Sequence, residues 1–174
     1  IARAAQLGVR TIEHATLIDE ASAAAVKAAD AFVVPTLVIV KALLEAAGAG
    51  ALPPWARGKL NEVSDHSLRG LDLMEKMGLK IGSGTDLLGN LHVNQTREFT
   101  LRREVQSSAS ILRSATSINA DLLGEPALGR LAPGCEADIL IVAGDPLKDI
   151  GVLAQDGRGI HSIMKGGRFH KHTR

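Results

Sequence analysis

This sequence is poor in the residue types that several protein classes require. Its 174 residues include one cysteine, no tyrosine and only 2% aromatic side chains. The single Cys135 excludes an internal disulfide framework and a zinc–cysteine cluster. Its place after Pro133 and Gly134 indicates a turn rather than a reactive nucleophile. With so few aromatic side chains, the chain offers no platform for stacking nucleic-acid bases.

Strong net charge and long apolar segments are absent as well. The formal net charge of +1 gives no electrostatic reason to expect binding to nucleic acid or to an anionic membrane. No apolar run approaches the roughly 20 residues that cross a bilayer. With 45% hydrophobic residues, the chain can still build a sizeable core from Ala, Val, Leu and Ile. We therefore expect a globular protein with no nucleic-acid or membrane partner.

The chain begins in the middle of a helical pattern. Ile1 is not an initiator methionine, and Ala4, Ala5 and Leu7 favour a helix although no capping residue precedes them. We therefore expect these residues to be the C-terminal part of a longer chain. A missing signal peptide then leaves the localisation of the parent protein open, with the cytoplasm favoured.

Helical and strand patterns alternate along residues 1–124. Short β-branched or apolar segments predict strands at residues 9–14, 31–40 and 79–86. Helices are predicted at residues 19–30, 57–77, 95–103 and 108–123, with a short helix and a loop within residues 41–54. This alternation favours parallel strands joined by helical crossovers.

The pattern changes near Gly129. A strand is predicted at residues 137–142, and a hairpin follows with Gly166 and Gly167 as its turn. No further long helical pattern occurs in this tail. We therefore expect a partial α/β domain over residues 1–128 and a small β domain over residues 129–174.

Polar side chains follow the three expected strands of the first domain. His14 follows "VRTIE", Thr36 comes just after "AFVV", and Asp86 follows "KIGSGT". Because the carboxyl ends of parallel strands share one edge, we expect His14 and Asp86 to open onto a common cavity. An imidazole and a carboxylate at such an edge can bind a divalent metal. Gly82 and Gly84 would let the backbone approach closely and adopt unusual dihedral angles before Asp86.

Less specific interpretations of these residues stay open. His14 can be a structural histidine at a strand end, and Asp86 can form an Asx-turn or cap a helix. His92, in the loop after Asp86, can contact a substrate or simply be exposed. Catalytic zinc normally takes three protein ligands and a water. Either the metal hypothesis is wrong or further ligands lie outside these residues, and the abrupt start favours the second.

Four segments carry a recognisable combination of motifs. They are "GVRTIEHATLIDE", "VVPTL", "GLKIGSGTDLLG" and the stretch from "SATSINADLLGEPALGRLAPGCEADILIVAGDPLKDI" to "IHSIMKGGRFHK". In this order and combination they resemble the amidohydrolase superfamily, and the resemblance covers essentially all 174 residues. The sequence is most similar to the branch of metal-dependent prolidases and imidazolonepropionase-like hydrolases.

This resemblance implies an α/β fold that is the C-terminal part of a (β/α)8 TIM-like barrel, strands six to eight, followed by strands of a small β-sandwich domain. Val33–Leu37 would be the seventh strand. His14 would bind metal, and Asp86 would both bind metal and act as the general base. The cofactor would be one or two divalent ions, with zinc expected. The family's other ligands, a His-x-His pair, a lysine and a further histidine, are missing, so the isolated chain is expected to be inactive.

The reaction that the resemblance implies is hydrolysis of a C–N bond in a small amide or dipeptide, with prolidase-like cleavage favoured. Thr36 and His92 are the candidate substrate contacts, and the parent protein is expected to be a homo-oligomer. Three alternatives stay open. They are a cyclic amidohydrolase of the imidazolonepropionase type, a non-catalytic α/β interaction domain, and a metal-free acid–base enzyme that uses His14 and Asp86.

Overall fold

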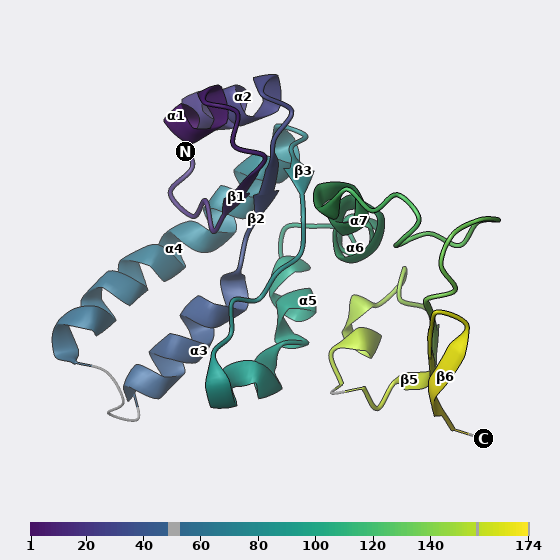
Figure 1. Ribbon diagram of the computed structural model, residues 1–174. Coiled ribbons are helices and arrows are strands. Elements are labelled where there is room, and N and C mark those ends of the chain that lie inside the picture. Colours follow the sequence, from purple (N-terminus) through teal and green to yellow (C-terminus); the bar gives the residue numbers. More distant parts are fainter. Residues whose placement is uncertain (49–52, 156, 174) are drawn as a thin grey trace.

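The computed structural model describes residues 1–48, 53–155 and 157–173, and these residues form two small sheets (Figure 1). The first sheet is parallel, in the order β1-β2-β3, and consists of Thr11–Glu13, Phe32–Val34 and Lys80–Ile81. The second is antiparallel, in the order β4-β5-β6, and consists of Ile139–Val142, Ile160–Lys165 and Arg168–His172. Helices connect the strands of the first sheet, which confirms the predicted α/β pattern with parallel strands.

Helices account for most of the remaining chain. The α-helices are α1 Ala2–Gln6, α2 Glu20–Ala28, α3 Leu37–Gly48, α4 Pro54–Lys76, α5 Arg97–Arg102, α6 Ser108–Arg113 and α7 Asn119–Leu123. Shorter elements are the 3-10 helices η1 Gly89–Asn94 and η3 Ile150–Leu153, and the π-helix η2 Ser114–Ile118. The loop predicted within residues 41–54 falls partly on residues 49–52, which lie outside the described ranges.

Local capping signals set several of these helix ends, as the sequence predicts. The Asp19 carboxylate accepts a hydrogen bond from the N–H of Ser22 (2.7 Å), and the Ser107 hydroxyl accepts one from the N–H of Ser110 (3.1 Å). Gly124 ends α7 in the left-handed conformation, with φ 77°. The single helix predicted over residues 108–123 is nevertheless divided, because the π-helix η2 lies between α6 and α7.

The main core joins the parallel sheet to helices α2 and α4. Val26 of α2, Val33 of β2 and Leu71 of α4 are completely buried, and Met74 and Ile81 are nearly so. Burying each such aliphatic side chain contributes about 1.5–3 kcal/mol to folding. The core is therefore aliphatic, as the composition predicts, and it anchors the strands whose ends carry the predicted functional residues.

The predicted strand at residues 31–40 is wrong in its second half. Strand β2 is shorter, and helix α3 begins at Leu37, inside the segment Val33–Leu37 that the resemblance assigns to a strand. The cause is a tertiary contact. The Glu98 carboxylate accepts hydrogen bonds from the N–H groups of Leu37 (3.4 Å) and Val38 (2.8 Å). These bonds satisfy backbone donors that a helix start otherwise leaves unpaired.

The C-terminal sheet lies beside α6 and α7 and away from the parallel sheet (Figure 1). A small separate core joins this region to the helices, because Ile111 of α6 packs with Ile150 and Leu153 of η3. Gly166 and Gly167 make the turn between β5 and β6 with φ 52° and 78°, which confirms the predicted hairpin. None of the helices within the described ranges combines the length and apolar character that crossing a membrane requires.

Candidate functional site

His14 lies immediately after strand β1, where the chain turns sharply. Its N–H donates to the carbonyl oxygen of Val34 in β2 (2.9 Å), so its backbone still belongs to the sheet edge. Both His14 and Ala15 have positive φ angles, 65° and 48°. Non-glycine residues rarely adopt this conformation, and such strain is concentrated at functional sites. The turn leaves the His14 side chain 54% exposed at the carboxyl end of the strands.

Asp86 lies at the same edge and approaches His14. It too has a positive φ, 53°, and a side chain that is 54% exposed. The His14 Nε2 atom and the Asp86 Oδ2 atom are 3.7 Å apart. This separation is longer than a direct hydrogen bond, so the two groups face one another without a short contact. Within the described ranges no backbone N–H donates to the Asp86 carboxylate, which argues against the Asx-turn interpretation.

Thr36 determines which nitrogen of His14 faces Asp86. The Thr36 hydroxyl and the His14 Nδ1 atom are 2.7 Å apart, and Thr36 is buried. Nδ1 is therefore engaged with the hydroxyl, and Nε2 is the ring nitrogen that points toward Asp86. A hydrogen bond to one ring nitrogen fixes the orientation and tautomer of an imidazole that binds or transfers protons through the other. The predicted substrate contact of Thr36 stays a prediction.

The two glycines before Asp86 make room for neighbouring side chains. A Cβ at Gly82 would lie 2.8 Å from the Asn119 Oδ1 atom, and one at Gly84 would lie 2.8 Å from Val34 Cγ1. Both distances are too short for real Cβ contacts, so the predicted close approach is confirmed. The predicted unusual dihedral angles are not found at either glycine, because the positive φ in this segment belongs to Asp86 itself.

A buried ion pair lies behind this edge, and the sequence reasoning missed it. Arg102 and Glu98 of α5 are 0% and 2% exposed, and the Arg102 Nε atom donates to Glu98 Oε1 (2.8 Å). Burial raises the pKa of the Glu98 carboxyl, against the opposing effect of the Arg102 guanidinium. The only sequence signal was the spacing of four residues between opposite charges, which is also typical of exposed helix faces.

The other predicted histidines do not join His14 and Asp86. His92 is exposed in η1 and lines a separate cavity of about 600 Å³ together with Gln95 and Ile160. His14 and Asp86 do not line that cavity. The predicted role of His92 in substrate binding stays a prediction. The histidines of the tail, His161, His170 and His172, are exposed.

His14 and Asp86 carry donor atoms of the kinds that bind divalent metals. Their imidazole nitrogen and carboxylate oxygen are ligand types that suit zinc and similar divalent ions, and they converge from the ends of β1 and β3, the two strands that flank β2. No group of three or more His, Cys, Asp or Glu side chains able to hold a metal occurs in residues 1–48, 53–155 and 157–173. The two donor types thus fit a divalent metal. They are fewer than the three protein ligands that a catalytic zinc normally takes.

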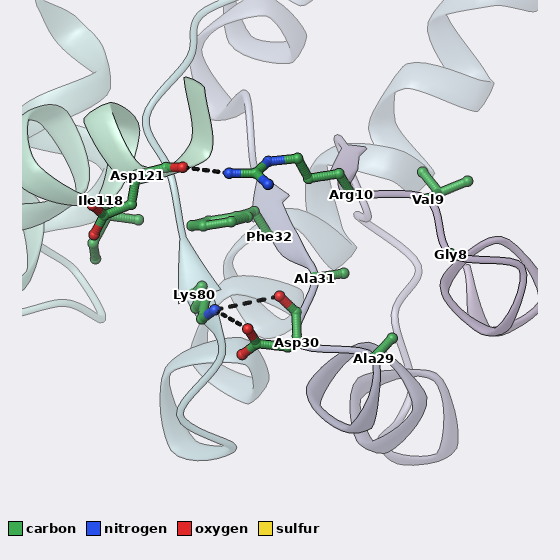
Figure 2. Close-up of a pocket in the computed structure, with 10 residues that line it drawn as sticks. All are labelled: Gly8, Val9, Arg10, Ala29, Asp30, Ala31, Phe32, Lys80, Ile118 and Asp121. Atoms are coloured by element: carbon green, nitrogen blue, oxygen red, sulfur yellow. Dashed lines mark hydrogen bonds and ion pairs between the residues drawn. The ribbon is translucent and has the colours of Figure 1, made fainter. Parts of the chain in front are cut away.

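A cavity of about 570 Å³ lies at the other end of the parallel strands. Figure 2 shows the residues that line it. Arg10 donates to the carbonyl oxygen of Asp121 across it (2.6 Å), and Lys80 forms an ion pair with Asp30. Both cationic groups also lie over the Phe32 ring, 5.5 and 5.0 Å from its centroid. Phe32 and Lys80 begin β2 and β3, so this cavity lies at the edge that contributes stability in parallel barrel folds.

Comparison with known proteins shows one consistent relationship. Residues 1–169 match the sequence model of the amidohydrolase family. An amidohydrolase of known crystal structure is 42% identical to this chain in sequence, with a TM-score of 0.94. The match covers 99% of this chain and 42% of the amidohydrolase chain. The structure of a prolidase in complex with N-methylphosphonate-L-proline is 39% identical, also with a TM-score of 0.94, over 99% of this chain and 42% of its own.

Curated proteins agree with this relationship at lower identity. Ochratoxinase from Aspergillus niger is 29% identical over 175 residues, which cover 98% of this chain and 36% of ochratoxinase. The chain therefore spans well under half the length of the relatives that it matches. Its α/β fold is that of amidohydrolase structures.

Proposed function

This chain belongs to the amidohydrolase family, and we propose that it is the C-terminal part of a metal-dependent enzyme that hydrolyses C–N bonds in small substrates. The observation that carries the proposal is the pairing of His14 Nε2 with Asp86 Oδ2, 3.7 Å apart at the carboxyl edge of a parallel sheet. Both residues hold a strained backbone conformation there, which a purely structural pair of exposed side chains does not require.

In this proposal the chain supplies one side of a barrel. Strands β1, β2 and β3 are strands six to eight of a (β/α)8 barrel, and residues 129–174 contribute strands to a small β-sandwich. The share of the relatives' length that the chain spans, 36% to 42%, agrees with such a part. The remaining metal ligands then come from the rest of the protein. The 174 residues alone are expected to have no hydrolase activity.

The residues of this chain have distinct roles in the proposed reaction. His14 would hold a divalent ion through Nε2, with Thr36 holding the ring from its other nitrogen. A bound divalent ion, zinc by expectation, supplies a water whose pKa is lowered toward about 7. The Asp86 carboxylate would bind the same centre, accept the proton of that water and later deliver it to the leaving nitrogen. Its exposure of 54% leaves it accessible from the edge of the sheet.

An Xaa-Pro dipeptide is the substrate class that we favour. The support is the 39% identity to a prolidase whose crystal structure contains N-methylphosphonate-L-proline. A cyclic amide is the second candidate, as the resemblance to imidazolonepropionase-like enzymes suggested. Turnover of a panel of Xaa-Pro dipeptides, other dipeptides and cyclic amides by the complete protein separates the two.

The decisive experiment compares two Asp→Asn variants of the complete protein. Asp86→Asn removes the proposed base, and we expect kcat/KM to fall by about 10²- to 10⁴-fold while the circular dichroism spectrum is unchanged. Asp72→Asn is the matched control, because Asp72 is a partly exposed carboxylate of α4 that pairs with Lys76 (2.6 Å) and not with His14 or Asp86. Its activity is expected to equal that of the wild type.

Three results would contradict the proposal in different ways. Full activity in Asp86→Asn excludes this carboxylate as the base. Active protein that elemental analysis finds free of stoichiometric metal excludes the metal-dependent mechanism and leaves the acid–base pair of His14 and Asp86. Absence of any hydrolytic turnover, with no bound metal, favours the interaction domain.

A further inference from the structure

The ion pair of Arg102 with Glu98 is connected to two of the strand ends at the proposed site, those of β2 and β3. One nitrogen of the guanidinium, Nη2, donates to the carbonyl oxygens of Pro35 and Gly82, each at 2.9 Å. Pro35 follows β2, and Gly82 follows β3. A single atom of Arg102 therefore bridges the exits of two neighbouring strands, and it fixes the separation between them.

The Glu98 end of the pair fixes the chain on the other side of Thr36. Its carboxylate accepts the N–H groups of Leu37 and Val38, while Arg102 holds the carbonyl of Pro35. Thr36 is thus anchored through the residues before and after it. Its hydroxyl is the group that lies 2.7 Å from His14 Nδ1. The ion pair does not touch His14, but it determines where the partner of His14 lies.

Stability alone is a poor explanation for this pair. Removing two charges from water is costly, and well-packed apolar side chains of similar volume are often at least as stabilising. The pair is also incompletely satisfied, since Arg102 Nη1 has no hydrogen-bond partner within the described part of the chain. What an apolar pair could not provide is directional bonding to two carbonyl and two N–H groups at once.

We propose that Arg102 and Glu98 are positioning residues that set the geometry of His14 and Asp86 for metal binding. The inference rests on the proposed function, because it concerns the same site. It assigns no contact with substrate or metal to either residue. The planar guanidinium reaches both strand exits at once, which a lysine ammonium at position 102 reproduces only in part.

The test uses the complete protein with the double substitution Glu98→Gln and Arg102→Met. The amide at position 98 keeps an acceptor for the start of α3, and the methionine fills the volume without leaving a buried unpaired charge. We expect this variant to fold with an unchanged circular dichroism spectrum. Its dissociation constant for zinc, measured by competition with a chelator, is expected to rise about 10- to 100-fold.

Two further variants complete the series. Arg102→Lys is expected to rescue part of the zinc affinity, so that it falls between the double variant and the wild type. The control is Asp72→Asn with Lys76→Met, which removes an ion pair of the same spacing from the exposed face of α4. This control is expected to keep the wild-type zinc affinity.

Crystal structures of the metal-free variants give a readout that does not depend on metal binding or activity. We expect the double variant to lose the contact of 2.7 Å between Thr36 Oγ1 and His14 Nδ1, and to change the distance of 3.7 Å between His14 and Asp86. If both distances and the zinc affinity are kept, the proposal is wrong. If the double variant does not fold, Arg102→Lys decides by the same measurements. A wild-type protein without bound metal contradicts the proposed function, and the distances still decide the positioning role.

Discussion

Replacing Gly82 by alanine tests whether close packing behind the strand end supports the site. The added methyl group would lie 2.8 Å from Asn119 Oδ1, 3.1 Å from Leu122 Cδ1 and 3.2 Å from Val34 Cγ2. It therefore meets neighbours from two different elements, α7 and β2. The Asn119 amide cannot move freely, because it exchanges hydrogen bonds of 2.9 Å with both the N–H and the carbonyl oxygen of Ser83.

The magnitude follows from these contacts. Inserting a methyl group into a packed region typically costs about 1–3 kcal/mol. Displacing the Asn119 side chain from Ser83 would add about 1 kcal/mol for weakened hydrogen bonds. We therefore expect Gly82→Ala to lower the free energy of unfolding by about 2–4 kcal/mol. Because Ser83 leads directly toward Asp86, catalytic activity should fall in the same variant.

Gly58→Ala is the matched control for this measurement. Gly58 lies inside helix α4, and a Cβ there would have no atom within 4 Å. The same chemical change is expected to stabilise the protein by about 0.5–1 kcal/mol, because alanine loses less backbone entropy than glycine in a helix. Urea denaturation of both variants of the complete protein measures the difference. If Gly82→Ala and the wild type unfold at the same urea concentration, the close packing around Gly82 does not affect the free energy of unfolding and the reasoning is wrong.

Two other predictions concern the hydrogen bond to His14 and the C-terminal hairpin. Thr36→Val keeps the side-chain shape but removes the partner of His14 Nδ1, so zinc affinity measured by chelator competition should fall about 10- to 100-fold; unchanged affinity would refute this orienting role. The Lys165 ammonium and the N–H of Gly166 hold the pKa of Asp138 below its usual value. The resulting stabilisation is complete above the unfolded pKa of about 3.9 and is lost as pH falls through the folded pKa, which a carbon-13 NMR titration of Asp138 locates. A titration midpoint for Asp138 at or above about 3.9 would contradict the lowered pKa.

Several features were predictable because their causes are local. Asp19 and Ser107 cap helices through bonds to residues three positions later, and Gly124 ends a helix by adopting a positive φ. Gly166 and Gly167 likewise form the hairpin turn from their own backbone freedom. Each signal depends on a few neighbouring residues, so the sequence contains it in full.

The sequence by itself also determined the class of the protein and which strand ends carry polar side chains. Alternating patterns indicated parallel strands with crossovers, and the rule for parallel sheets directed attention to His14, Thr36 and Asp86. The combined motifs predicted the family that the comparison then established. These inferences needed the order of residues along the chain and no knowledge of distances.

Only the tertiary structure decided how these residues are held. Residues 37–40 form a helix rather than a strand because Glu98, about 60 positions away in sequence, binds the first N–H groups of that helix. The bridge from Arg102 to two strand exits, and the contact of Thr36 with His14, likewise join segments distant in sequence. Such contacts exist only after the strands have paired and the helices have packed. Local pattern therefore located the candidate site, while folding set its geometry.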